Sequence, residues 1–250
     1  MLMDAQVNEV SDRDAGSLAE PGSDEGTLVF FVSGNTHKAA ELSAALRMRV
    51  ELLPPPVEVQ GTLADIATAK VLYGAALLGL HVKNDNVAGG AGTGPHGKAS
   101  AMLASSSGNM TLSPAEERII VADDTALCLD ALGGMPGPYI RHFLAAIGND
   151  GLARIAASLG DTGAEGITCI AARMPDGAIE VFEGRARGSL VPPRPAQDRR
   201  EGKSAMGWDP IFLPDGQERT FSEMSVGEKN QLSPRGKAVA KLIAWLDALI

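Results

Sequence analysis

The sequence predicts an α/β fold built on a mixed β-sheet, because strand-like segments alternate with helical ones and one strand pair is antiparallel. Residues 27–33 (TLVFFVS) and 118–121 (RIIV) are apolar runs typical of buried strands. Residues 167–173 and 178–184 flank Met-Pro-Asp-Gly, the pattern of a β-hairpin. A chain of 250 residues is long enough to bury a sizeable core in one domain.

The remaining elements follow from hydrophobic periodicity and local start signals. Helices are expected over 36–46, 139–147, 151–159 and 233–250, and a short strand over 50–53. Between that strand and the one at 118–121, Thr62 followed by Asp65 has the spacing of a helix cap, so a further helix begins there.

Two segments depart from the composition of a folded domain. Residues 1–26 hold seven acidic residues against one arginine, which accounts for six of the nine net negative charges. They read as a disordered acidic tail before a single domain at 27–250. Residues 84–114 are rich in Gly, Ser and Asn, and we interpret them as a low-complexity insertion in that domain.

Composition excludes several function classes. A net charge of −9 argues against non-specific binding to nucleic acid or to an anionic membrane. We find neither a secretory signal nor an apolar run of the ~20 residues that a membrane span needs, so we expect a cytoplasmic protein. Cys128 and Cys169 lie in apolar runs and are expected to be buried free thiols.

Two motifs place polar groups where a sheet meets its loops. Ser33-Gly34-Asn35 joins the first strand to a helix, whose N-terminal N–H groups and dipole favour an anion, and Lys38 adds a positive charge there. Asp123 and Asp124 are expected at the end of a buried strand, where open α/β sheets bind ligands. Adjacent carboxylates favour a cation such as Mg²⁺, although neighbouring extended residues point in opposite directions.

A third cluster combines an aromatic ring with charges. Trp208 and Asp209 are followed by a Pro-Asp-Gly turn, and Lys229 and Arg235 flank the start of the last helix. Such a set suits a polyanion that carries a flat ring, as a nucleotide does. Trp208 is equally compatible with a place in the core.

Three segments in this order, SGNTHKAAEL, VADDTALCLDALGGMPGPYIRHFL and GWDPIFLPDG…FSEM…EKNQLSPRGKA, resemble the signature segments of the inosine triphosphate pyrophosphatase family in its eukaryotic form. The resemblance covers roughly residues 28–242 apart from the insertion. It implies an elongated fold with two lobes around a central nucleotide-binding cleft, a homodimer, and dependence on Mg²⁺, for which Mn²⁺ can substitute. The implied reaction converts a purine nucleoside triphosphate with a non-standard base into the monophosphate and pyrophosphate.

The resemblance also implies roles for individual residues. Substrate-binding positions correspond to Ser33, Gly34, Asn35, Lys38, Lys70, Met206, Gly207, Trp208, Asp209, Lys229, Ser233 and Arg235. Glu58 and Asp124 correspond to metal ligands, and Lys38 stabilises the leaving group. Either Asp123 or Asp124 serves as the general base that activates water, and the sequence does not decide between them.

Two departures from the family pattern leave the preferred base open. Met206 stands where the family has a stacking Phe, and Pro234 stands where a base-contacting His is common. Donors from Lys229 and Arg235 would favour the C6 oxygen of hypoxanthine or xanthine over the amine of adenine. The alternatives are a Maf-like pyrophosphatase of other modified nucleotides and a nucleotide-binding module without hydrolytic activity.

Overall fold

The structure is a computed structural model that describes residues 28–57, 59–80, 118–194 and 207–249. The tail predicted over 1–26 and the insertion predicted over 84–114 lie outside these residues, so both stay predictions. The predicted site residues Glu58 and Met206 also lie outside the described residues.

One seven-stranded mixed sheet forms the centre of the fold, which confirms the predicted class. Its strands are β1 (Leu28–Val32), β2 (Val50–Leu53), β3 (Arg118–Leu129), β4 (Pro136–Gly137), β5 (Gly163–Arg173), β6 (Ile179–Leu190) and β7 (Phe212–Pro214). Their order is β2-β1-β3-β5-β6-β7, and β4 pairs with β3. β1 runs parallel to β2 and β3, whereas the remaining pairs are antiparallel.

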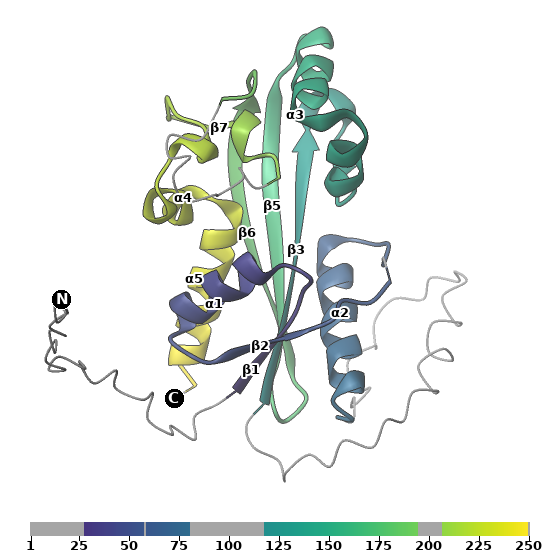
Figure 1. Ribbon diagram of the computed structural model, residues 1–250, viewed down its shortest axis with the longest axis vertical. Coiled ribbons are helices and arrows are strands. Elements are labelled where there is room, and N and C mark those ends of the chain that lie inside the picture. The colour runs from purple at the N-terminus through teal and green to yellow at the C-terminus, as the bar shows by residue number, and fades with distance from the viewer. Residues whose placement is uncertain (1–27, 58, 81–117, 195–206, 250) are drawn as a thin grey trace, which may run out of the picture.

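The long strands β3, β5 and β6 give the molecule its elongated shape, and helices gather around each end of them (Figure 1). The helices are α1 (Thr36–Leu46), α2 (Leu63–Leu77), α3 (Ile140–Ser158), α4 (Val226–Leu232) and α5 (Pro234–Asp247). Around the first lobe, which holds β1 and β2, lie α1 and α5 on one face of the sheet and α2 on the other. The second lobe carries α3, α4 and β7, so the predicted two-lobed shape is confirmed.

Strand β3 contributes in turn to the cores on both faces of the first lobe. Ile119 and Val121 pack in the cluster formed with α1 and α5, whereas Ile120 and Ala122 pack in the cluster formed with α2. This alternation follows from the opposite directions of neighbouring side chains in a strand. A third cluster, in the second lobe, packs α3 against Phe212 and its neighbours.

The prediction that Asp123 and Asp124 end a strand is wrong, because β3 continues to Leu129. Its parallel pairing with β1 stops at Val121, but its antiparallel pairing with β5 starts at Ile120 and runs to the end of β3. Strand β5 therefore continues to pair with β3 beyond Asp123 and Asp124. Both acids still follow the last parallel pair, so they lie at the carboxyl edge of β1.

The other predicted elements are confirmed with small differences. Helices predicted over 139–147 and 151–159 are the two halves of α3, which breaks at Gly148, where φ is 66° and ψ is −178°. The hairpin is present as β5 and β6, both longer than predicted. Helix α4 was not predicted, although Ser225 and Glu228 form the capping box that starts it.

Helix α5 packs tightly against β6, and Gly184 makes the close approach feasible. A Cβ at this position would lie 2.0 Å from the carbonyl oxygen of Pro234 and 2.6 Å from the backbone nitrogen of Ala238. The first turn of α5 therefore rests directly on the strand.

Two lysines of α5 also bind the backbone of β6. Lys237 Nζ donates to the carbonyl oxygen of Arg185 at 2.9 Å, and Lys241 Nζ donates to that of Glu183 at 2.6 Å. β7 pairs only with the last three residues of β6. The two lysines therefore cover part of the β6 edge that β7 does not pair with.

Candidate functional site

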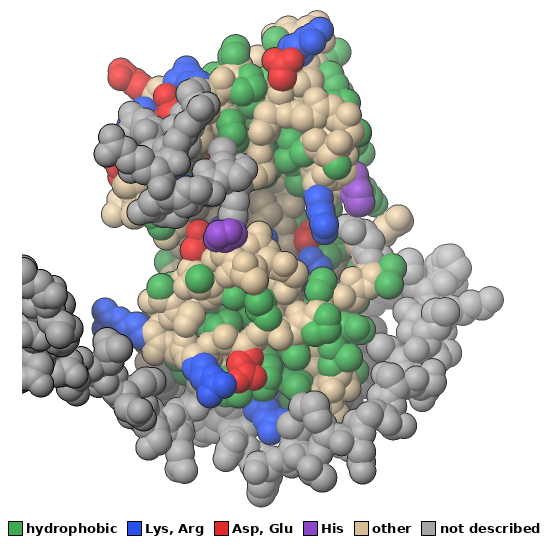
Figure 2. Space-filling view, viewed as in Figure 1, with side chains coloured by type: hydrophobic (Ala, Val, Ile, Leu, Met, Phe, Trp, Pro, Cys, Tyr) green, Lys and Arg blue, Asp and Glu red, His purple; other side chains and the backbone are tan. Residues whose placement is uncertain are grey.

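A cavity of about 850 Å³ lies between the two lobes. Figure 2 shows the surface hollowed there, with charged side chains of both signs in the recess. Every described residue that the sequence assigned to the site lines this cavity: Ser33, Gly34, Asn35, Lys38, Lys70, Asp123, Asp124, Gly207, Trp208, Asp209, Lys229, Ser233 and Arg235. Val57 and Val59 line it as well, one on each side of Glu58 in the sequence.

The turn between β1 and α1 is ordered by its own side chains. Asn35 is the N-cap of α1, and its Oδ1 accepts from the backbone N–H groups of His37 at 3.0 Å and Lys38 at 3.2 Å. Ser33 Oγ in turn accepts from the N–H of Asn35 at 3.1 Å. These bonds satisfy backbone N–H groups at the start of α1 and hold in place the turn from which the Lys38 side chain extends.

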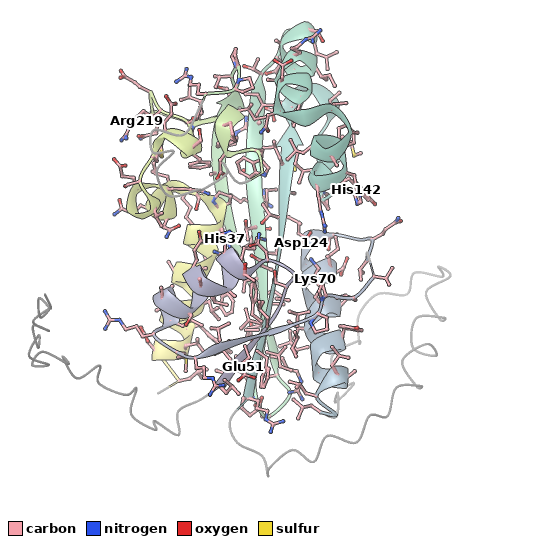
Figure 3. The ribbon with its side chains drawn as sticks, viewed as in Figure 1. His37, Glu51, Lys70, Asp124, His142 and Arg219 are labelled. Atoms are coloured by element: carbon pink, nitrogen blue, oxygen red, sulfur yellow. The ribbon has the colours of Figure 1, made fainter. Side chains whose placement is uncertain are left out.

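Asp123 and Asp124 point to opposite faces of the sheet, as their positions in one strand require. Asp123 is on the face of α1 and α5, where Lys38 Nζ lies 3.0 Å from its Oδ1 and Arg235 Nε lies 2.9 Å from its Oδ2. Asp124 is on the face of α2, where Lys70 Nζ lies 2.6 Å from its Oδ1. Figure 3 shows Lys70 and Asp124 meeting near the middle of the molecule.

The two acids differ in their pKa. Burial, which leaves Asp123 5% exposed, would raise its pKa, but the charges and hydrogen bonds of Lys38 and Arg235 lower it to about 2. For Asp124, burial is the larger effect and raises the pKa, while Lys70 partly opposes it. Asp123 is therefore ionised at neutral pH, whereas the pKa of Asp124 lies above its ordinary value.

Arg235 connects three elements around Asp123. Its Nη2 donates to the carbonyl oxygen of Lys38 at 2.9 Å, and its Nη1 donates to Glu41 Oε2. Sequence reasoning missed Glu41, although it follows Lys38 by three residues and so shares its helix face. Arg235 therefore contacts the acidic residues Asp123 and Glu41, and its role is not limited to a base pocket.

The opposite end of the cavity contains the aromatic cluster. Trp208 is 9% exposed, and its ring lies 5.0 Å from that of Phe212 and 6.0 Å from that of Phe221, between ring centroids. It is therefore a core residue that also lines the cavity. Asp209 Oδ2 lies 2.5 Å from Lys229 Nζ; burial raises the pKa of Asp209, and Lys229 opposes the rise.

Further lining residues were not predicted from the sequence. Arg141 lies in the first turn of α3, and Asn230 lies in α4 between Lys229 and Ser233. Arg141 is an exposed residue that adds a cation to Lys38, Lys70, Lys229 and Arg235 at the cavity. The sequence held no signal for Asn230, because α4 was not predicted.

Neither cysteine belongs to the site. Both are free thiols; Cys169 is buried, as predicted, whereas Cys128 is partly exposed. Burial, followed by the neighbouring Glu183, raises the pKa of Cys169 to about 11, and burial also raises that of Cys128. Both thiols are protonated at neutral pH and are therefore weak nucleophiles.

Two features are absent from the residues that the structure describes. These residues contain no group of three or more His, Cys, Asp or Glu side chains arranged to hold a metal ion. None of the helices among them is long and apolar enough to cross a membrane.

Comparisons with known proteins agree with the fold. The model of the Ham1 family matches residues 97–245. The inosine triphosphate pyrophosphatase of Fusarium vanettenii is 34% identical over 221 residues, covering 87% of this chain and 95% of that protein. That of Pyricularia oryzae is 33% identical, with 87% and 92% covered.

Solved structures show the same architecture. A HAM1 protein from Coxiella burnetii superposes with a TM-score of 0.64 at 23% identity, covering 89% of this chain and 100% of that one. A nucleoside-triphosphatase described as a dITP/XTP pyrophosphatase, from Mycobacterium abscessus, has a TM-score of 0.55 at 28% identity, with 86% and 98% covered.

Proposed function

The chain belongs to the Ham1 family, and we propose that it is an Mg²⁺-dependent pyrophosphohydrolase of nucleoside triphosphates. The substrates are purine triphosphates with non-standard bases, namely ITP, dITP and XTP, which are cleaved between the α and β phosphates. Monophosphate and pyrophosphate are the products, and the activity removes such nucleotides from the pool. One observation carries the proposal: a single cavity joins a cluster of acids and cations to an aromatic end.

The acid and cation end suits a triphosphate. Lys38, Lys70 and Arg235 reach the cavity from α1, α2 and α5, and each is paired with Asp123 or Asp124. Lys38 and Lys70 keep about a fifth of their side chains exposed, at 22% and 20%, so phosphate oxygens can reach them. Fixed cations in a partly dry cleft stabilise charge that develops on a pyrophosphate leaving group.

Of the two acids, we assign Asp124 as the base. Its side chain is 21% exposed, and Lys70 bonds only its Oδ1, so a water molecule can reach the other carboxylate oxygen and give up a proton to it. Asp123 is 3% exposed at its side chain and is held by two cations, so its role is to orient Lys38 and Arg235.

Mg²⁺ fits the donor set at this end of the cavity. Hard cations of this kind take carboxylate oxygens and complete their shell with water and substrate phosphates, so one or two protein carboxylates suffice. Asp124, with Glu58, would hold the ion, and Mn²⁺ can replace it. When bound, the ion neutralises phosphate charge.

The aromatic end suits a purine. Trp208 offers the edge of a rigid aromatic cluster, and the Asp209–Lys229 pair fixes a donor beside it. A donor that faces the C6 oxygen of hypoxanthine or xanthine would be left unpaired by the amine of adenine, at a cost of ~1–3 kcal/mol. Pro234 carries no side-chain donor, so discrimination rests on Lys229, Ser233 and the backbone.

The experiment is a product assay on the full chain with Mg²⁺. ITP, XTP, GTP, ATP, UTP and dTTP are incubated separately, and the products are resolved by chromatography. We expect IMP and pyrophosphate from ITP, with little turnover of ATP. Preferred turnover of UTP or dTTP would favour a Maf-like activity, IDP with phosphate would place the cleavage at another bond, and binding without turnover would favour a non-hydrolytic module.

A matched pair of variants tests the base. We expect Asp124→Asn to lower kcat by ~10²- to 10⁴-fold, the usual contribution of a positioned base. Asp130→Asn makes the same chemical change at an exposed carboxylate paired with Arg187, and kcat should stay unchanged. Equal kcat in both variants would remove Asp124 from the mechanism.

A homodimer and a cytoplasmic location, both expected from the sequence, complete the proposal. Light scattering on the purified chain measures the mass, and a result of one chain per particle would refute the dimer.

A further inference from the structure

We infer that Asn149, outside the cavity lining, is a positioning residue for the aromatic end of the site. The inference rests on the proposed function, because it assigns this residue to the binding of the purine. Its effect would be transmitted through the backbone of Gly207.

The break in α3 lies directly before Asn149, whose side chain extends from the helix to Gly207. Gly148 has non-helical backbone angles, and Asn149 is the next residue. Its Nδ2 donates to the carbonyl oxygen of Gly207 at 3.0 Å, across 58 positions of sequence. One hydrogen bond therefore ties the middle of α3 to Gly207, the residue before Trp208.

The contact requires a donor. Asn149 Oδ1 is buried and has no hydrogen-bond partner among the residues that the structure describes. Turning the amide over would place that oxygen against the carbonyl of Gly207 and lose the bond. The side chain therefore acts through its NH₂ group, a requirement that helix formation alone would not impose.

The bond adds to the contacts that hold the cavity wall formed by Gly207, Trp208 and Asp209. Trp208 is held by its ring contacts with Phe212 and Phe221, and Asp209 is held by Lys229. Gly207 lines the cavity, is exposed and directly precedes Trp208, so the bond from Asn149 restrains the backbone that leads into Trp208, which the ring contacts do not hold. A wall that is already held in place loses less conformational freedom when a base binds, so the bond should raise the affinity for the base.

The effect should be confined to ligands that carry a base. Lys38 and Lys70, at the other end of the cavity, take no part in the Asn149 contact. A ligand made of phosphates alone should not detect its loss.

The test uses Asn149→Asp in the full chain. The variant keeps the size of the side chain and its tolerance at a helix start, but replaces the donor by an oxygen. Asp150→Asn is the matched control: it is the next residue, exposed, and 3.7 Å from Arg154, with no contact to Gly207. Asn149→Ala removes the donor without adding charge.

We expect the KM for ITP to rise about 5- to 10-fold in both Asn149 variants, as for one lost hydrogen bond. We expect kcat to change less than 2-fold, and the Ki of inorganic triphosphate as a competitive inhibitor to stay the same. Asp150→Asn should match the wild type. A wild-type KM in both Asn149 variants, or an equal rise in the KM for ITP and the Ki of triphosphate, would overturn the inference.

A second measurement does not depend on turnover. In a Trp245→Phe background, Trp208 is the remaining tryptophan. Loss of the Asn149 bond should shift its emission to the red and increase its quenching by acrylamide, whereas unchanged emission would overturn the inference. Absence of ITP turnover in the wild type would refute the proposed function, and the emission would still decide whether Asn149 holds this wall.

Discussion

Replacing Asp123 by Asn should destabilise the fold by an amount that depends on pH. The carboxylate is buried between Lys38 and Arg235, and their charges lower its pKa from 3.8 to about 2. At ~1.4 kcal/mol for each pKa unit, this difference corresponds to about 2 to 3 kcal/mol of stability at neutral pH. Asn resembles the protonated acid in shape, so the variant should lose about that much.

The sign follows from proton linkage. A group whose folded pKa lies below its unfolded pKa stabilises the fold fully above the unfolded value and loses this effect as pH falls through the folded value. The difference between wild type and Asp123→Asn should therefore be complete at pH 7, about half as large at pH 3, and nearly absent below pH 2.

Urea unfolding at pH 7, 4 and 3, followed by circular dichroism, measures this difference. Asp130→Asn serves as the control, because its exposed pair with Arg187 should contribute less than ~1 kcal/mol. A difference for Asp123→Asn that is as large at pH 3 as at pH 7 would refute the reasoning, since the lost contribution would then not come from the ionised carboxylate.

Two further predictions concern packing and the aromatic end of the site. Gly184→Ala should destabilise the protein by about 3 kcal/mol, because its Cβ would meet backbone atoms of α5; Gly227→Ala, in an open position of α4, should leave the urea midpoint equal or higher. Lys229→Met should raise the KM for ITP about tenfold by leaving the buried Asp209 without its cation, and steady-state kinetics that match the wild type would contradict that role.

Local patterns were sufficient to predict much of the first lobe and of the site. The alternation along β3 fixed the opposite directions of Asp123 and Asp124, and three ordered motifs indicated residues that meet in one cavity. The end of β3 was misplaced because the apolar run stops at the acids, while the pairing that continues the strand comes from β5. A strand's length is set by its partner as well as by its own residues.

Contacts between distant segments had no signal in the sequence. Arg235 binds Glu41 across 194 positions, and Asn149 binds Gly207 across 58. Neither pair has a spacing that a helix or strand imposes, so neither partner indicates the other. Helix α4 was missed for a different reason: its seven residues are too few to show a clear hydrophobic period.

The lysine contacts of α5 with β6 have a consequence for synthesis of the chain. An uncovered strand edge is a template on which another chain can add a strand, and lysine side chains are a common protection. On the carbonyls of Arg185 and Glu183, that protection comes from Lys237 and Lys241, about fifty residues later in the chain. While the ribosome makes those residues, the hairpin is complete but its edge is bare. Until α5 is made, this part of the edge has no lysine cover and can accept a strand from another chain.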